Sequence, residues 1–433
     1  MSPYATCAAR VVCAIAFAAG VPCPTAPAAA QTIAITNARI HPVSGPAIER
    51  GTVLMRDGRI TAVGAAVAVP EGARVIDATG KVVTPGLFNA ATTLGIVEIG
   101  AVAGTNDART VNPRITAAFR VTDALNPNGT VIPVTRVEGI TRAVVAPGPG
   151  SSLIAGQGIA IDLGTEGFPG MVVKEPVAMY AMLGEAGAQL AGGGRGAAML
   201  ALREALQDAR DYAANRAAYD RAERRAYPLS RLDLEALVPV VSGTLPLAVY
   251  ASRASDILAA LRLADEYHLR LILLGAEEGW MVADAIRSAG VAVVLDPMQN
   301  IPSFEQLGAT LENAARLHAR GVQIAIANFT AHNARNVKYA AGNAVAYGLP
   351  WDAALEALTV NPARIFGIDA SYGTLQPGKD ADVVIWSGDP FEVTTAVETV
   401  FIEGKEMPKD NRQLELLRRY RRLDASIPPA YHY

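Results

Sequence analysis

Apolar and polar positions alternate in short runs at the N-terminal end of the chain. Turn-forming residues separate these runs, and Asp57-Gly58 is a hairpin signal between two of them. The runs cover residues 33–40, 52–56, 60–63 and 73–76. This pattern predicts a small antiparallel sheet over residues 32–81.

The pattern changes at about residue 82 and keeps its new form to about residue 367. Strand-like apolar runs alternate there with segments whose apolar residues recur at helical spacing. The clearest examples are residues 247–251, 254–267, 271–274, 281–289, 291–295, 304–319 and 322–327. Strands that alternate with helices predict parallel β/α units, and their number favours a closed barrel over a single Rossmann half.

Short β segments return after Gly367, at residues 381–386 and 397–402, followed by the turn residues Glu403-Gly404. The simplest arrangement is a sheet that the β/α region interrupts and the C-terminus completes. The predicted fold is therefore α/β. It has a (β/α)₈ TIM-type barrel over residues 83–367 and a composite β-sandwich domain from residues 31–82 and 368–408.

Two helical segments do not fit this scheme. Residues 196–227 predict one long, half-exposed helix that ends before Pro228, and we interpret it as an insertion that could cover the barrel mouth. Residues 409–433 form a C-terminal helical tail that is rich in arginine. Its basic face is compatible with a membrane or a protein partner, but the nearly neutral chain favours a solvated helix that packs on the sheet.

Residues 1–30 have the features of a secretory signal peptide. Arg10 precedes an apolar run over residues 11–21, and Ala28-Ala29-Ala30 has the form of a cleavage site. All three cysteines of the chain lie in this segment, so the mature chain would contain none. No later stretch reaches about 18 consecutive apolar residues, so no integral membrane segment is predicted. We expect an exported protein, periplasmic or extracellular.

Composition narrows the list of partners. The 38 basic and 41 acidic residues give a net charge of −3, which offers no general attraction for nucleic acid. The chain holds only five histidines, few for a protein that binds a transition metal through imidazole. The expected ligand is a small molecule.

Blocks at both ends of the chain resemble the imidazolonepropionase-like branch of the amidohydrolase superfamily. The matching blocks are residues 35–40, 57–60, 76–81, 84–87 (TPGL), 358–363, 373–375, 377–384 (PGKDADVV) and 400–405. They follow the family's order and bracket nearly all of the mature chain. The resemblance implies a barrel with a composite β-sandwich and a hydrolase that acts on C–N bonds outside ordinary peptides.

The sequence departs from this family at the positions that hold its metal ions. The resemblance places a His-x-His pair at the end of the first barrel strand, further histidines after middle strands and an aspartate after the last strand. These positions carry Ala91, Thr93, Ser252 (or Tyr250), Leu274 (or Gly275) and Asn328. None is an effective zinc ligand, and an amide oxygen is no general base. We therefore predict no cofactor and expect the family's zinc to be absent.

Other polar residues near the predicted strand ends are candidates for a pocket. They are Thr93, Glu98, Tyr250, Arg253, Glu277, Asn328, His332 and Arg335. His332 is the one histidine in a loop expected at the C-terminal face of the strands. Structural alternatives exist for three of these features: the loop after residue 331 can cap a helix, Glu277 can favour a helix N-terminus, and Arg253 can form a rim ion pair.

Two functions follow from these observations. The chain is either a hydrolase of C–N bonds that does not use the family's histidines, or a non-catalytic barrel. A non-catalytic barrel would bind a ligand or act as a partner subunit of an active sister amidohydrolase, and homo-oligomers are compatible with both. Loss of both histidines of the first pair together with the later ligands favours abandonment of the metal chemistry.

Overall fold

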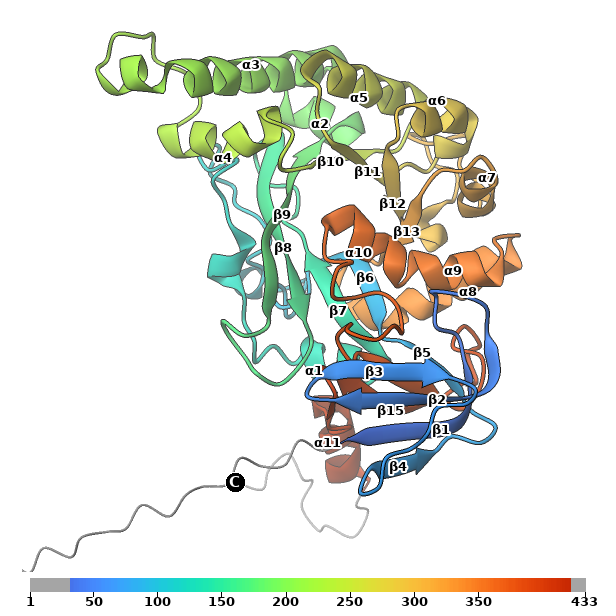
Figure 1. Ribbon diagram of the computed structural model, residues 1–433. Helices are drawn as coiled ribbons and strands as arrows, with labels where there is room; N and C mark the ends of the chain where they lie inside the picture. The colour runs from blue at the N-terminus through green and yellow to red at the C-terminus, as the bar shows by residue number, and fades with distance from the viewer. Residues whose placement is uncertain (1–31, 422–433) are drawn as a thin grey trace, which may run out of the picture.

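The computed structural model describes residues 32–421, so the predicted signal peptide and the last part of the tail lie outside the described residues. Two sheets build the molecule, each with eight strands (Figure 1). Strands from both chain ends form the first sheet: β1 (Ile33–Ile40), β2 (Ile48–Arg56), β3 (Arg59–Gly64), β4 (Arg74–Asp77), β5 (Val82–Pro85), β14 (Val383–Trp386), β15 (Val397–Ile402) and β16 (Lys405–Glu406). The predicted composite domain is confirmed.

Strand order explains how the two ends meet. The order is β16-β15-β14-β5-β1-β2-β3, and β4 pairs with the first half of β1. Asp57 and Gly58 have positive φ and turn the chain from β2 into β3, as the sequence predicts. Apolar side chains such as Ile35 of β1 and Phe401 of β15 share one core. Because β5 extends to Pro85, the domain boundary lies at Gly86, slightly later than the predicted residue 82.

The second sheet forms the barrel, in the order β13-β12-β11-β10-β9-β8-β7-β6. Its strands are β6 (Leu87–Thr92), β7 (Ile140–Val145), β8 (Ile154–Asp162), β9 (Val172–Met182), β10 (Leu247–Ala251), β11 (Leu271–Gly275), β12 (Ala292–Leu295) and β13 (Ile324–Ile326). β8 is antiparallel to both of its neighbours, which corrects the expectation of eight parallel strands. Loops, not helices, join β7 to β8 and β8 to β9.

The barrel is nearly closed, and a side chain bridges its seam. β6 and β13 are the two ends of the hydrogen-bonded strand order. Asn89 of β6 donates from Nδ2 to the carbonyl of Asn328 at 3.2 Å, and its Oδ1 accepts from the Asn328 amide at 3.0 Å. Oδ1 also accepts from the amide of Ala91 at 3.3 Å. A buried side-chain amide thus replaces a pair of backbone hydrogen bonds.

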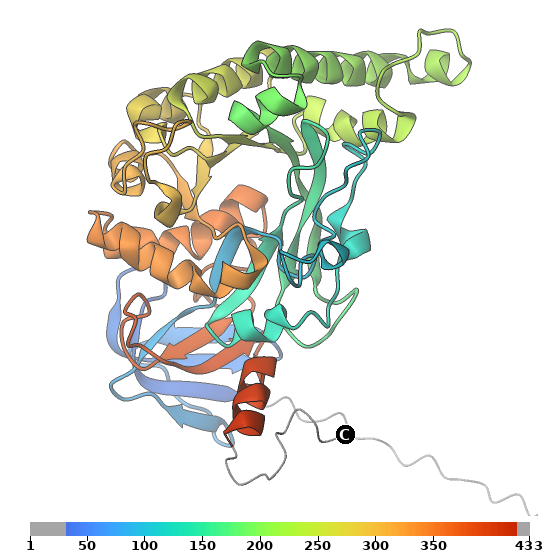
Figure 2. The same cartoon turned by 180° about the vertical axis from the view of Figure 1, so that it is seen from behind.

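Helices cover the outside of the barrel (Figure 2). They include α2 (Gly184–Leu190), α3 (Arg195–Asp220), α4 (Arg231–Val241), α5 (Ala254–Tyr267), α6 (Ala283–Ser288), α7 (Asn313–Ala319), α8 (Val337–Ala346), α9 (Trp351–Ala357) and α10 (Val360–Phe366), with the short α1 (Val131–Arg136) after β6. The prediction for residues 254–267 matches α5. The predicted helix over 304–319 begins only at Asn313, because the amide of Gly308 bonds to the Glu278 carboxylate and not to a helical carbonyl.

The long predicted helix is α3, which ends at Asp220 and has non-helical backbone at Asn215. It does not cover the mouth. Arg203 donates to Glu266 and Arg210 to the carbonyl of Tyr267, so α3 runs along the outer side of α5. Only its first residue, Arg195, reaches the start of α5, where it pairs with Asp256 at 3.0 Å. The helix is therefore part of the outer layer.

The tail forms α11 (Arg412–Tyr420), in which no side chain is buried. Arg335 donates to Gln413 of this helix at 3.1 Å. This leaves a solvated helix at the edge of the molecule (Figure 1). Within residues 32–421, no helix combines the length and hydrophobicity needed to cross a bilayer.

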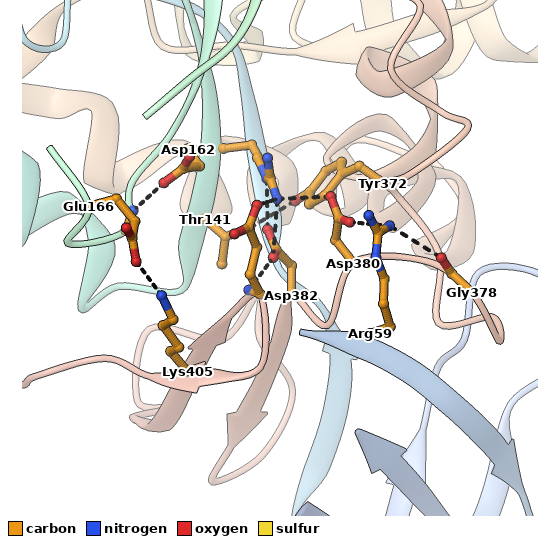
Figure 3. A network of polar contacts seen from close by, with 12 residues as sticks. Arg59, Thr141, Asp162, Glu166, Tyr372, Gly378, Asp380, Asp382 and Lys405 are labelled. Atoms are coloured by element: carbon orange, nitrogen blue, oxygen red, sulfur yellow. Dashed lines mark hydrogen bonds and ion pairs between the residues drawn. The ribbon is translucent and has the colours of Figure 1, made fainter. Parts of the chain in front are cut away.

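A buried ion network joins the barrel to the composite sheet (Figure 3). Arg142 of β7 donates to Asp382 at 2.9 Å and to Asp380 at 3.1 Å, and its side chain is only 2% exposed. Its guanidinium lies 5.2 Å from the ring centre of Tyr372, whose hydroxyl bonds to the carbonyl of Gly86. The network therefore fixes the junction where β5 passes into β6.

Candidate functional site at the barrel mouth

Apolar side chains fill the inside of the barrel. Phe88, Ala91, Leu274 and Tyr180 belong to one buried cluster, and the Tyr250 ring lies 5.5 Å from that of Phe329. The Tyr180 hydroxyl is buried without a hydrogen-bond partner. Burial raises the pKa of Tyr180 and of Tyr250, and the negative charge of Glu277 raises the pKa of Tyr250 further. Both phenols are therefore neutral at ordinary pH.

The positions expected to hold the family's metal carry side chains that cannot do so. Ala91 and Leu274 are fully buried and apolar. Thr93 accepts a hydrogen bond from the amide of Ala331 at 3.1 Å, and Asn328 Oδ1 accepts from the amide and hydroxyl of Thr330. Among residues 32–421 there is no group of three or more His, Cys, Asp or Glu side chains placed to hold an ion. These residues do not fit a zinc ion, which needs three or four converging donors.

Two buried carboxyl groups with raised pKa values follow neighbouring strands at the mouth. Glu277 comes after β11 and is 8% exposed, and Asp296 follows β12 and is 4% exposed. Burial raises the pKa of Glu277, although a hydrogen bond with the Ser252 side chain opposes the shift, and its Oε2 has no hydrogen-bond partner. Burial raises the pKa of Asp296 to about 6. With a pKa of about 6, the Asp296 carboxyl group can exchange protons near neutral pH.

The other sequence candidates have structural contacts. Glu98 accepts from the amide and hydroxyl of Thr130 at the start of α1, so it does not face the barrel interior. Arg253 donates to Ser255 at the start of α5. His332 is exposed in the short 3-10 helix Ala331–Asn336, and Arg335 of that helix points to α11. The structure therefore brings together Tyr250, Ser252 and Glu277, whereas the hydrogen bonds of Glu98, Arg253 and Arg335 go to other residues.

Sequence reasoning left three residues of this region out of the site. Asn89 closes the seam, Tyr180 fills the interior, and Asp296 adds the second buried carboxyl. Asp296 had a usable signal, since it directly follows an apolar strand and precedes a proline. Tyr180 had none, because its partners come from distant strands.

Comparisons with known proteins define the class. The model of the "Amidohydrolase family" matches residues 201–407. The chain is 25% identical over 392 residues to amidohydrolase tasK of Hapsidospora irregularis; the match covers 82% of this chain and 39% of that protein. An amidohydrolase from Thermotoga maritima MSB8 superposes with a TM-score of 0.79 at 26% identity, covering 87% of this chain and 100% of that one. Molinate hydrolase, at 19% identity and a TM-score of 0.54, covers 88% of this chain and 95% of its own, and shares the fold.

These matches, together with the barrel and the composite sheet, identify the chain as a member of the amidohydrolase superfamily. The imidazolonepropionase-like branch stays a prediction. The chain spans only 39% of tasK, so that relative carries much additional sequence.

Proposed function

We propose that this chain is a non-catalytic member of the superfamily that acts as a partner subunit of an active amidohydrolase. One observation carries the proposal: the metal-ligand positions hold apolar side chains, as at Ala91 and Leu274, or hydrogen-bonded ones, as at Thr93 and Asn328. Side chains of these kinds would not hold an ion that lowers the pKa of water, and that step begins metal-assisted hydrolysis.

The rim of the mouth supports a role in association. Large apolar side chains are exposed in the loops after β11 and β12, among them Phe304, which is fully exposed, and Leu307, which is 73% exposed. Met281, Met298 and Ile301 are exposed in the same loops. Neighbouring exposed apolar residues are typical of protein contacts.

Metal content, turnover and complex formation test this proposal. The purified mature chain should contain no stoichiometric divalent metal, turn over no member of an amide and urea panel, and remain inactive as the Ala91→His/Thr93→His variant. It should co-purify with a superfamily member that has an intact His-x-His pair and is encoded beside it. Phe304→Ser/Leu307→Ser should weaken that complex about tenfold or more, whereas the control Val393→Ser, 77% exposed in the composite domain, should not. Bound zinc with turnover would contradict the proposal.

A second candidate is metal-independent hydrolysis of a small C–N substrate, and buried Glu277 favours it. Its carboxylate would take a proton from water as the water oxygen attacks the carbonyl carbon. The carboxylic acid would then return that proton to the leaving nitrogen as the C–N bond breaks. Tyr250 and Ser252 would line the substrate's path. In this case Glu277→Gln abolishes turnover, and the control Glu312→Gln, exposed on the surface, does not.

We also propose that the protein is exported. The apolar run over residues 11–21 and the Ala28-Ala29-Ala30 sequence support this. N-terminal sequencing of the protein from its native host should give Gln31 as the first residue. A mature chain that begins at Met1 in the cytoplasm would contradict it.

A further inference from the structure

A cleft of about 480 Å³ opens at the end of the barrel opposite to the mouth. It lies where β10, β11 and β12 begin, since Pro246, Leu271 and Ala292 line it. Its volume falls in the range of small-molecule sites, roughly 300–1,000 Å³. No step of the proposed function uses this cleft.

The cleft combines an apolar floor with a cationic rim. Ile272 and Ile365 are buried and form part of the floor, and Arg270 and Arg364 stand at the rim with exposed side chains. Neither arginine forms an ion pair with a described residue, and Arg270 makes one long hydrogen bond, 3.4 Å, to the carbonyl of Thr244. Their guanidinium groups are therefore available to a ligand.

The surroundings add positive charge to this rim. Lys174 donates to the carbonyls of Phe366 and Gly367 at the end of α10, the helix that carries Arg364. Burial lowers the pKa of Lys174, and the charge of Arg270 lowers it further, while the negative charge of Asp369 opposes the shift; Lys174 and Arg270 therefore lie close enough to repel each other. Asp265 is the one acidic residue among the described residues of the lining.

We propose that this cleft binds a small organic oxyanion, a carboxylate or phosphate monoester on an apolar body. Guanidinium donors have the fork geometry that matches two oxygens of such a head group. Burial of the apolar body on Ile272, Ala292 and Ile365 would supply the remaining affinity. An oxyanion would also relieve the repulsion between Arg270 and its cationic neighbours.

Calorimetry on the full chain with four probes tests the proposal: hexyl phosphate, hexanoate, inorganic phosphate and hexanol. Hexyl phosphate, hexanoate or both should bind, and inorganic phosphate and hexanol should bind at least about tenfold more weakly. Arg270→Gln and Arg364→Gln should each raise the Kd about tenfold or more, the loss expected for a charge-assisted contact. The matched control Arg262→Gln, exposed on α5 outside the cleft, should change the Kd less than about twofold.

Several results would overturn the inference. Equal binding of inorganic phosphate means that the floor contributes nothing, and equal binding of hexanol means that the arginines contribute nothing. No binding of any probe, or an equal effect of Arg262→Gln, rejects the site. Urea unfolding of each variant is measured as a control. An unchanged unfolding curve shows that weaker binding comes from the lost contact and not from a folding defect. Metal content and partner binding are separate readouts, so failure here leaves the proposed function standing.

Discussion

Replacing Asp296 by asparagine should stabilise the protein at neutral and alkaline pH. Asp296 follows β12, is 4% exposed, and accepts a hydrogen bond from the amide of Met298 at 3.0 Å. Asparagine is nearly the same size, and its side-chain carbonyl can accept that bond. The substitution therefore removes the buried charge and little else.

The pKa gives the magnitude and the sign. Burial raises the pKa of Asp296 from its ordinary 3.8 to about 6 in the folded protein. A difference of about 2 units corresponds to about 3 kcal/mol. Because the folded pKa is the higher one, the contribution of this group to stability is complete below pH 3.8 and is lost as the pH rises through about 6. Asp296→Asn should therefore gain up to about 3 kcal/mol at pH 8 and little at pH 4.

Urea unfolding followed by circular dichroism at pH 4, 6 and 8 measures the difference. Asp284→Asn, at a position whose side chain is 75% exposed, should leave stability within about 0.5 kcal/mol of the parent. Asp256→Asn should destabilise, because it breaks the ion pair with Arg195. The reasoning would be refuted if Asp296→Asn did not raise the free energy of unfolding at pH 8, or if it raised it equally at pH 4 and pH 8.

Three further predictions concern the barrel as a whole. Arg142→Met should reduce the free energy of unfolding by about 3–5 kcal/mol, because it leaves buried carboxylates without their cation. The double variant Arg142→Met/Asp382→Leu should recover much of this loss. Urea titration measures both variants. Asn89→Ala should cost at least about 2 kcal/mol in the same assay because it unpairs backbone groups at the seam, and Asn89→Asp should also destabilise at neutral pH because it buries a charge and removes the donor to the Asn328 carbonyl. Excess zinc or EDTA should leave the thermal midpoint unchanged, since a ligand raises it only by binding the folded state; a rise with zinc would contradict the expectation that the mouth binds none.

Patterns within one segment predicted the fold where they were distinctive. The helical period over residues 254–267 and the Asp57-Gly58 turn are both present in the structure. The direction of a strand could not be predicted in this way. Residues 154–162 form an apolar run, and such a run is equally compatible with a parallel and an antiparallel strand. The local pattern also gave a wrong prediction at residues 304–312, where the backbone amide of Gly308 donates to the carboxylate of Glu278, 30 residues away in the chain.

The candidate site shows the same division between local and distant information. Which residues stand at the metal-ligand positions can be read from the sequence, and their unsuitability as ligands follows from their chemistry. The contacts of Thr93, Glu98 and Arg335 cannot be read from the sequence, because their partners lie 238, 32 and 78 residues away in the chain. Burial of Glu277 and Asp296 likewise depends on the packing of several loops, so their raised pKa values could not be predicted.

Polar groups at this mouth now hold the barrel together. Asn89 closes the seam, and Thr93 secures the loop that starts at Ala331, so two residues of the first strand end are used in structural contacts. Ala91 between them is fully buried in the apolar interior. A histidine at position 91 would have to displace packed neighbours, and one at 93 would release the loop. A metal site at positions 91 and 93 would therefore require repacking of the interior as well as new ligands, which is why we expect the Ala91→His/Thr93→His variant to remain inactive.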